Sequence, residues 1–366
     1  MDIRSDKISL NDSLEAVNDW FYDQGWTDGL PIVPPTAERV EKLLAWTDRN
    51  PEDELGPVPP KYGIATIEKL AINAVMAGCL PEYFPIIITA VEAMLESQFN
   101  LYAVQSTTHP CAPLLILNGP IARELGVNAR YNAFGQGWRA NATIGRAIRL
   151  ILLNVGGGWP GDLDKSTLGH PGKYSYAIAE NEVDSPWAPY HVEKGFAAED
   201  STVFVIAAEP PHSVTNHVAD DPEGILDSIC SAMSTIAHNN AVSSGHCAVV
   251  IGPEHARTIA AKGWSRHDVK SYLHMNAYNL FGELAFDHRY GRVYNRNLPR
   301  WYKREPDSRI PIVPSPDHIH LFVIGGAAGR FSAFIPGWGH MSSPVLRGIE
   351  TGANAAPVCV DETCYL

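Results

Sequence analysis

Four short apolar runs, rich in β-branched residues, constrain the fold of this chain more than any other feature. They cover 112–117, 202–207, 247–251 and 320–324, and glycine, proline or charged residues bound them. Such runs are typical of strands that are buried on both faces of a layered α/β core. Apolar residues recur at helical spacing between them, for example over 223–238. We therefore expect an α/β fold with a layered sheet flanked by helices.

Two of these runs belong to a longer internal similarity. The segment 113–123 (PLLILNGPIAR) resembles 248–257 (AVVIGPEHAR), and both predict a strand, a Gly-Pro turn and a helix. This similarity favours a duplicated α/β unit that forms two packed lobes. The expected organisation is then N-terminal helices and a proline-rich arm over 1–62, a first α/β lobe over 63–200, and a second over 201–366.

The remaining patterns predict further elements. A helix over 10–24 would be capped by Ser9 or Asn11, and a helix ending at Leu44 would be capped by Thr36. Other expected elements are an extended connection over 51–60, two helices over 66–96 broken around Gly78–Pro81 and Pro85, a helix over 223–238 capped by Asp221, and a helical pair over 265–286.

Bulk composition narrows the function classes. The chain has 366 residues, 45% of them hydrophobic and 19% charged, which describes a compact protein with little disorder. A formal net charge of −13 disfavours a nucleic-acid or anionic-membrane surface. No apolar run approaches the roughly 20 residues that a bilayer span needs, and the charged start has no signal core. We expect a cytoplasmic protein that forms an oligomer.

A segment rich in arginine and glycine, residues 135–162, predicts a small-molecule site. Helical spacing puts Arg139 and Arg146 two turns apart on one face, with Arg149 adjacent to Arg146. Guanidinium groups on a mostly buried helix need anionic partners. The partners are either a substrate carboxylate or phosphate, or acids of the chain itself. On the first interpretation Arg139, Asn141 and Arg146 bind a small anionic substrate.

Two glycine-rich loops extend this interpretation. Gly157 lies in the loop 156–158, and Gly326 lies in the loop 325–329, which Arg330 and Ser332 follow. Backbone N–H groups in such loops suit an oxyanion or a phosphate, although a tight turn also requires glycine. The loop 325–329 matches neither a Walker A nor a Gly-x-Gly-x-x-Gly pattern, so nucleotide binding is not indicated there.

Histidines are the candidates for acid-base chemistry. His109 and His246 each precede a predicted strand, and α/β proteins place their sites at strand ends. One neutral imidazole and one carboxylate suffice to move a proton from an anion that arginines hold. His191 and Glu193 would share one side of an extended segment. The alternative for each histidine is a simple hydrogen bond at the end of a loop.

A divalent transition metal is a further hypothesis. It draws on His109, His246, His212 and His217, with Glu209 or Glu193 as a carboxylate ligand. The sequence contains no His-Glu-x-x-His or similar tight spacing, and no motif for a nucleotide, flavin, nicotinamide or pyridoxal phosphate cofactor.

The cysteines allow two thiol hypotheses. Cys111 near His109, or Cys247 beside His246, could act as a thiolate nucleophile, although an inert buried thiol is the simpler interpretation. Cys359 and Cys364 at the end of the chain could form a redox pair or belong to a frayed tail.

The motif WTDGLPIVPPT at 26–36, the segment 135–158 and GPEHA at 252–256 carry a family resemblance. On these residues the chain resembles a largely uncharacterised bacterial family associated with UGSC-motif (seleno)proteins. The resemblance implies a partner subunit that carries that motif, with this chain as one half of a heteromeric enzyme. The nearest string in this sequence is SSGHC at 243–247.

These observations together predict a lyase or hydrolase that acts on a carboxylate- or phosphate-bearing substrate. Arg139, Arg146 and Arg330 would orient the anion, and His109 or His246 would transfer a proton. The alternative is a non-catalytic or partner-dependent subunit of a heteromeric thiol or selenol redox complex.

Overall fold

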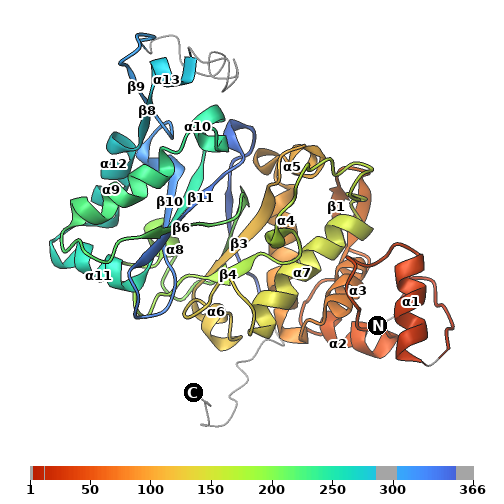
Figure 1. Cartoon of the computed structure of the whole chain (residues 1–366). Coiled ribbons are helices and arrows are strands. Elements are labelled where there is room, and N and C mark those ends of the chain that lie inside the picture. Colours follow the sequence, from red (N-terminus) through yellow and green to blue (C-terminus); the bar gives the residue numbers. More distant parts are fainter. Residues whose placement is uncertain (1–2, 12, 286–302, 352–366) are drawn as a thin grey trace.

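The computed structural model describes residues 3–11, 13–285 and 303–351 (Figure 1). The α-helices are α1 (Leu14–Asp23), α2 (Ala37–Leu44), α3 (Ile67–Ala77), α4 (Phe84–Leu95), α5 (Leu101–Ser106), α6 (Pro120–Glu124), α7 (Arg139–Asn154), α8 (Tyr190–Glu193), α9 (Pro222–Met233), α10 (Asn239–Ser243), α11 (Pro253–Ala261), α12 (Arg266–Asn276) and α13 (Phe281–Ala285). The strands are β1 (Glu54–Val58), β2 (Gly63–Thr66), β3 (Ala112–Asn118), β4 (Ala177–Ala179), β5 (Thr202–Ala208), β6 (His212–Thr215), β7 (Cys247–Ile251), β8 (Tyr278–Leu280), β9 (Arg309–Pro311), β10 (Ile319–Val323), β11 (Phe331–Pro336) and β12 (Val345–Gly348).

Two four-stranded sheets in the described residues follow one plan. The first has the order β12-β5-β3-β4 and the second the order β6-β11-β7-β10. In each sheet the last pair of strands is parallel and the other pairs are antiparallel. The central strands β3 and β7 each lead through a Gly-Pro turn into a helix, α6 and α11 respectively. The predicted α/β class, with sheets flanked by helices, is therefore confirmed, and the two halves share one topology.

The two halves exchange a strand. Although β6 follows β5 in the chain, it pairs with β11, and β12 follows β11 but pairs with β5. At the crossing, Ala208 and Gly337 form an antiparallel bridge, and the Glu209 N–H donates to the Pro336 carbonyl at 2.8 Å. Each sheet thus needs a strand from the other half. The predicted boundary at residue 200 does not separate the sheets, because β5 and β12 both complete the sheet of β3.

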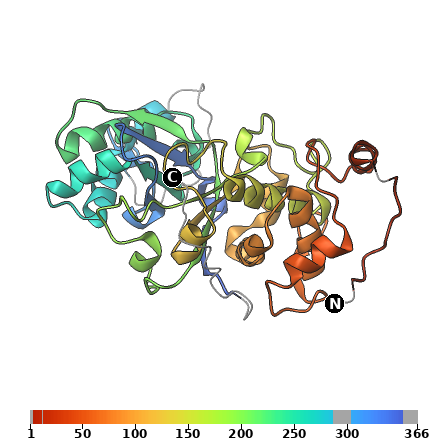
Figure 2. The ribbon, with the colours of Figure 1, turned by 90° about the horizontal axis from the view of Figure 1, so that it is seen from below.

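The sheets pack face to face, with helices on both outer faces (Figures 1 and 2). Alternation along β3 places Leu114 and Ile116 in the layer between the sheets, where they join Phe322 of β10. Leu115 and Leu117 point the other way, into the core shared with α3, α4 and α7. On the second sheet α9, α11 and α12 cover the opposite face. Both faces of β3, β5, β7 and β10 are buried, which explains their continuous apolar runs.

The N-terminal segment differs from the prediction in its caps. Helix α1 begins at Leu14, and the Ser13 hydroxyl accepts from the Ala16 N–H, so neither Ser9 nor Asn11 caps it. Thr36 occupies the N-cap position of α2 without a side-chain hydrogen bond. The expected extended connection contains β1, which pairs with β2. Helices α3 and α4, with the break between them, are as predicted.

The C-terminal half also matches in part. Asp221 caps α9, as expected, through its carboxylate and the Gly224 N–H. The predicted helical pair over 265–286 is wrong in its second member, because the chain after α12 forms β8 and the short α13. Pairing of β8 with β9 replaces helix continuation there. In the described part of the chain, every helix is too short or too polar to cross a membrane.

Candidate functional site

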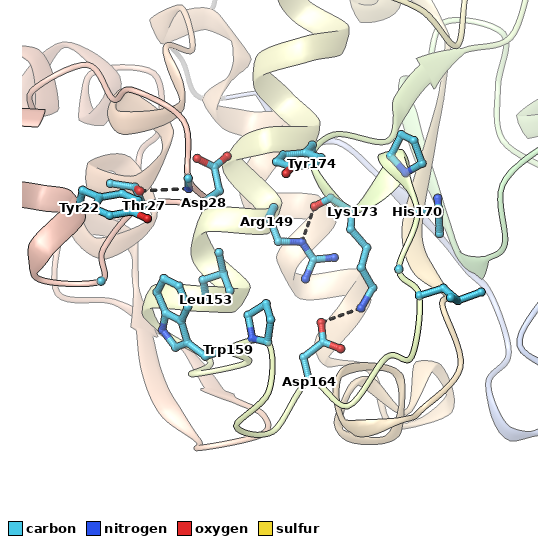
Figure 3. A pocket seen from close by; sticks show the side chains of 16 residues that line it. Tyr22, Thr27, Asp28, Arg149, Leu153, Trp159, Asp164, His170, Lys173 and Tyr174 are labelled. Atoms are coloured by element: carbon cyan, nitrogen blue, oxygen red, sulfur yellow. Dashed lines mark hydrogen bonds and ion pairs between the residues drawn. The ribbon is translucent and has the colours of Figure 1, made fainter. Parts of the chain in front are cut away.

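A cavity of about 810 Å³ lies between the N-terminal segment and α7 (Figure 3). Tyr22 of α1 and the following turn at Asp28 form one wall, Arg149 and Leu153 of α7 form another, and residues from the loop 159–174 close the third side. Small-molecule pockets typically measure roughly 300–1,000 Å³. The cavity therefore has the size of a site for a metabolite.

Arg149 is one of two cations, with Lys173, that line this cavity among the described residues. Its side chain comes from a buried position of α7, the residue is 8% exposed, and its Nε donates to the Lys173 carbonyl at 2.7 Å. Neither terminal guanidinium nitrogen has a hydrogen-bond or ion-pair partner within 3–11, 13–285 and 303–351. Burial lowers the pKa of Arg149, which the Asp164 carboxylate opposes. The terminal nitrogens open into the cavity, and an anion bound there would also balance the charge of this largely buried side chain.

The two carboxylates that line the cavity already have partners. Asp164 accepts from the Lys173 ammonium at 2.6 Å, and Figure 3 shows this pair beside the Arg149 guanidinium. Both oxygens of Asp28 accept from Arg146, each at 2.8 Å. These two pairs cancel their own charges. Among the lining residues that the structure describes, one positive charge is then left without a carboxylate partner, on Arg149.

The predicted anion clamps point elsewhere. Arg139 donates twice to the Gly78 carbonyl, at the end of α3, and Arg146 holds Asp28. Arg330 binds the Glu254 carboxylate at 2.9 Å and two carbonyls. The open alternative, that acids of the chain partner these arginines, describes Arg146 and Arg330. None of the three lines the cavity, so the sequence selected neighbours of the site rather than the cation in it.

The polar residues predicted beside those arginines also have internal partners. The Asn141 side chain makes two hydrogen bonds to the backbone of Asn128, at 2.7 and 2.9 Å. Ser332 is buried, and its hydroxyl bonds to the His255 ring at 2.9 Å. Both side chains join loops to the core rather than face the cavity.

Contacts within the chain involve both glycine loops. The N–H groups of Gly156, Gly157 and Gly158 donate to carbonyls in the last turn of α7, so this loop is a helix C-cap. Gly326 packs under the ring of Tyr131. In the same loop the Gly329 N–H and Arg330 bind the carboxylate of Glu254, and these bonds lower the pKa of Glu254. An acid of the chain itself occupies the predicted oxyanion site.

His109 forms a pair with Glu209. Its Nε2 lies 2.7 Å from the Glu209 Oε1, and its Nδ1 accepts from the Cys111 N–H at 3.2 Å. A ring nitrogen that accepts from an N–H is unprotonated. The ring proton is therefore on Nε2, which donates a hydrogen bond to the Glu209 carboxylate. Both ring nitrogens are therefore engaged. His109 and Glu209 join the start of β3 to the end of β5, outside the residues that line the cavity.

His246 belongs to a separate group at the start of β7. Its ring stacks on His318 and its Nδ1 lies 3.0 Å from the His320 Nε2. The His320 Nδ1 in turn lies 2.7 Å from the Tyr190 hydroxyl. Burial, and then the neighbouring His318, lower the pKa of His246 to about 4. At neutral pH these rings are uncharged, with His246 hydrogen-bonded to His320 and stacked on His318.

His191 and Glu193 do not share an extended segment, because residues 190–193 form the short helix α8. His191 is completely buried, and its Nδ1 lies 3.8 Å from a Glu182 oxygen. Glu193 forms ion pairs with Arg266 and Lys270. The predicted pairing of His191 with Glu193 is wrong, since a helix turns the two side chains to different neighbours.

The metal and thiol hypotheses find little geometric support. In the part of the chain that the structure describes, His, Cys, Asp and Glu side chains form no group of three that could hold a metal ion. The metal itself stays a prediction. Burial raises the pKa of Cys111 to about 12 and also raises that of Cys247, which disfavours a thiolate. Cys359 and Cys364 lie outside the described residues.

Sequence reasoning did not select Arg149, Lys173 or Asp164 as site residues. Arg149 was visible as a cation inside the apolar run 148–153, and its spacing from Leu153 puts both on one helix face. Nothing in the local sequence shows which arginine lacks an acid partner. Comparisons with family models, with curated proteins and with solved structures give no match for this chain, so the resemblance noted above and the partner subunit that it implies stay predictions.

Proposed function

We propose that this chain is a small-molecule enzyme that holds an anionic substrate on Arg149, in the cavity beside α7. The observation that carries the proposal is the buried guanidinium, whose two terminal nitrogens face the cavity without a partner among the described residues. An anion there would restore both the hydrogen bonds and the charge balance that burial removes.

The Lys173–Asp164 pair is the proton-transfer group in this proposal. Its ammonium and carboxylate lie 2.6 Å apart in the same cavity, and their side chains are 18% and 8% exposed. Proton transfer next to a fixed cation favours reactions that develop negative charge, which is lyase or hydrolase chemistry. The predicted His109 is less suited to this step because both of its ring nitrogens are engaged. A cytoplasmic location belongs to the same proposal.

Thermal melting with benzoate, citrate and inorganic phosphate tests the binding step. At about 100 times its Kd, a ligand should stabilise the native protein by about 2.7 kcal/mol. We expect at least one of the anions to raise the melting temperature of the wild type and none to raise that of Arg149→Met. Arg257→Met is the matched control, because Arg257 is exposed on α11 and donates to the Ala327 carbonyl. An identical response of all three proteins would refute the assignment of Arg149.

Incubation with a library of small carboxylic acids and phosphate esters, followed by mass spectrometry, tests the chemical step. We expect turnover in the wild type and its loss both in Lys173→Met and in the double variant Lys173→Met/Asp164→Asn, which leaves no unpaired carboxylate beside Arg149. Turnover that persists in Lys173→Met would remove this pair from proton transfer.

A further inference from the structure

Arg149 and Leu153 are one helical turn apart on α7, and both face the cavity. The site thus presents a cation and an aliphatic side chain side by side on a rigid element. Trp159 lies beyond Leu153, after the C-cap of α7, and lines the same cavity (Figure 3). A ligand that satisfies both ends needs one charged head and an apolar body.

We infer that the ligand is a monocarboxylate with a flat, apolar body, rather than a phosphate ester. This inference rests on the function proposed above and adds the chemical class of the substrate. The carboxylate lies on the terminal nitrogens of Arg149, and the body extends along Leu153 toward Trp159.

The geometry of Arg149 selects the head group. The Lys173 carbonyl engages Nε, so only the two terminal nitrogens are free, at the end of the guanidinium. Two parallel N–H groups match the two oxygens of a carboxylate in a bidentate contact. The end-on approach also leaves the Lys173 carbonyl bond in place.

The charge of the cavity selects against phosphate. Asp28 and Asp164 are both lining residues, and each is neutralised by one cation. One uncompensated positive charge remains, which a carboxylate cancels. A phosphate monoester carries about −1.5 to −2 near pH 7, so it would leave excess negative charge beside two carboxylates.

The side chains that line the cavity indicate the chemistry of the ligand's apolar part. Leu153 is buried and Trp159 is half-buried, while Tyr22 and Tyr174, which also line the cavity, are 66% and 55% exposed. Aromatic side chains stack on flat rings and bury large apolar areas. A volume of about 810 Å³ far exceeds a carboxylate group alone, so the head group by itself leaves most of these walls uncovered.

Isothermal titration at pH 7 with 2-naphthoate, 2-naphthyl phosphate and acetate separates these features. We expect the wild type to bind 2-naphthoate at least about tenfold more tightly than either of the other two probes. Arg149→Met should weaken the affinity for 2-naphthoate by about tenfold to a hundredfold. Arg149→Lys keeps the charge but loses the two parallel N–H groups, and it should weaken this affinity by about tenfold. Arg257→Met is the control for folding and nonspecific charge, and circular dichroism checks each variant.

The outcomes separate the inference from the proposed function. If 2-naphthyl phosphate binds as tightly as 2-naphthoate and Arg149→Met loses both, the anion site stands and the choice of carboxylate is wrong. If acetate binds as tightly as 2-naphthoate, the apolar body is wrong. If none of the probes binds the folded wild type, or if binding does not depend on Arg149, both the inference and the proposed function are wrong.

Discussion

The two sheets share a strand order, but the buried arginines on the helices that cover them have different surroundings. Arg149 on α7 and Arg266 on α12 are both buried, on helices that pack against the parallel edge strands β4 and β10. Arg266 binds Glu180, Glu193 and two carbonyls, whereas Arg149 has one carbonyl and an open cavity. The same topology therefore contains one buried arginine that stabilises the fold through acid partners and another that has no acid partner among the described residues and faces a cavity.

Substituting the two arginines should give the largest difference. Arg266→Met leaves the fully buried Glu180 without its cation, so we expect a loss of about 3–5 kcal/mol in the free energy of unfolding. Arg149→Met removes a charge without an acid partner and should cost about 1 kcal/mol or less. Urea titration followed by circular dichroism measures both. Equal losses would show that Arg149 is also a structural cation.

The close packing of α7 against the chain that leads into β4 gives the next largest expected effect. A Cβ on Gly145 would lie 2.4 Å from the Ser175 Oγ and 2.5 Å from the Tyr176 backbone nitrogen. We expect Gly145→Ala to destabilise the protein by about 2–3 kcal/mol, although helix propensity alone would favour alanine by about 1 kcal/mol. Thermal or urea unfolding decides the sign, and stabilisation by Gly145→Ala would refute the tight packing. Ala142→Gly, at an exposed position of α7, is the control for propensity.

The N-terminal wall of the cavity depends on the pair of Asp28 and Arg146. Their side chains are 3% and 14% exposed, and Arg146 also donates to the carbonyls of Leu30 and Pro31. Asp28→Asn should cost about 2 kcal/mol, because the remaining carbonyl bonds retain part of the contact. It should also speed proteolysis within residues 25–33. Unchanged proteolysis of that segment would show that other contacts hold the wall in place.

The smallest expected effect is a pH dependence from the second sheet. The pKa of His246 in the folded protein is about 4, below its ordinary value of 6.5, so the unfolded chain binds more protons between these values. The contribution of His246 to stability is therefore complete above pH 6.5 and is lost as the pH falls toward 4. His246→Gln should reduce the loss between pH 7 and pH 5 by about 1 kcal/mol, after allowance for partial exposure.

Urea titrations at pH 7, 6 and 5 measure this slope. His267→Gln, at an exposed position of α12, is the matched control for the substitution itself. A slope that is identical in the wild type and His246→Gln would contradict a buried neutral imidazole at this position.

Each strand that sequence reasoning found is buried on both faces. Each of β3, β5, β7 and β10 consists of buried residues only, so its apolar run was visible. The strand β6 was missed because three of its four residues are exposed, and β4 was missed because it has only three residues. Segments this short form a strand only because they pair with a neighbouring strand in the folded protein. The exchange of β6 and β12 could not be read from local patterns for the same reason.

The sequence by itself determined the α/β class, the repeated strand-turn-helix unit and a buried helix that carries arginines. Hydrophobic periodicity and turn residues act locally, and the sequence records them directly. Only the tertiary structure decided which arginine is free. The acids that neutralise the others are distant in the chain, since Asp28 lies 118 residues from Arg146 and Glu254 lies 76 residues from Arg330. Charge compensation in a buried site depends on distances of a few ångströms in space. Only the folded structure therefore shows that Arg149, unlike Arg146 and Arg330, has no acid partner among the described residues.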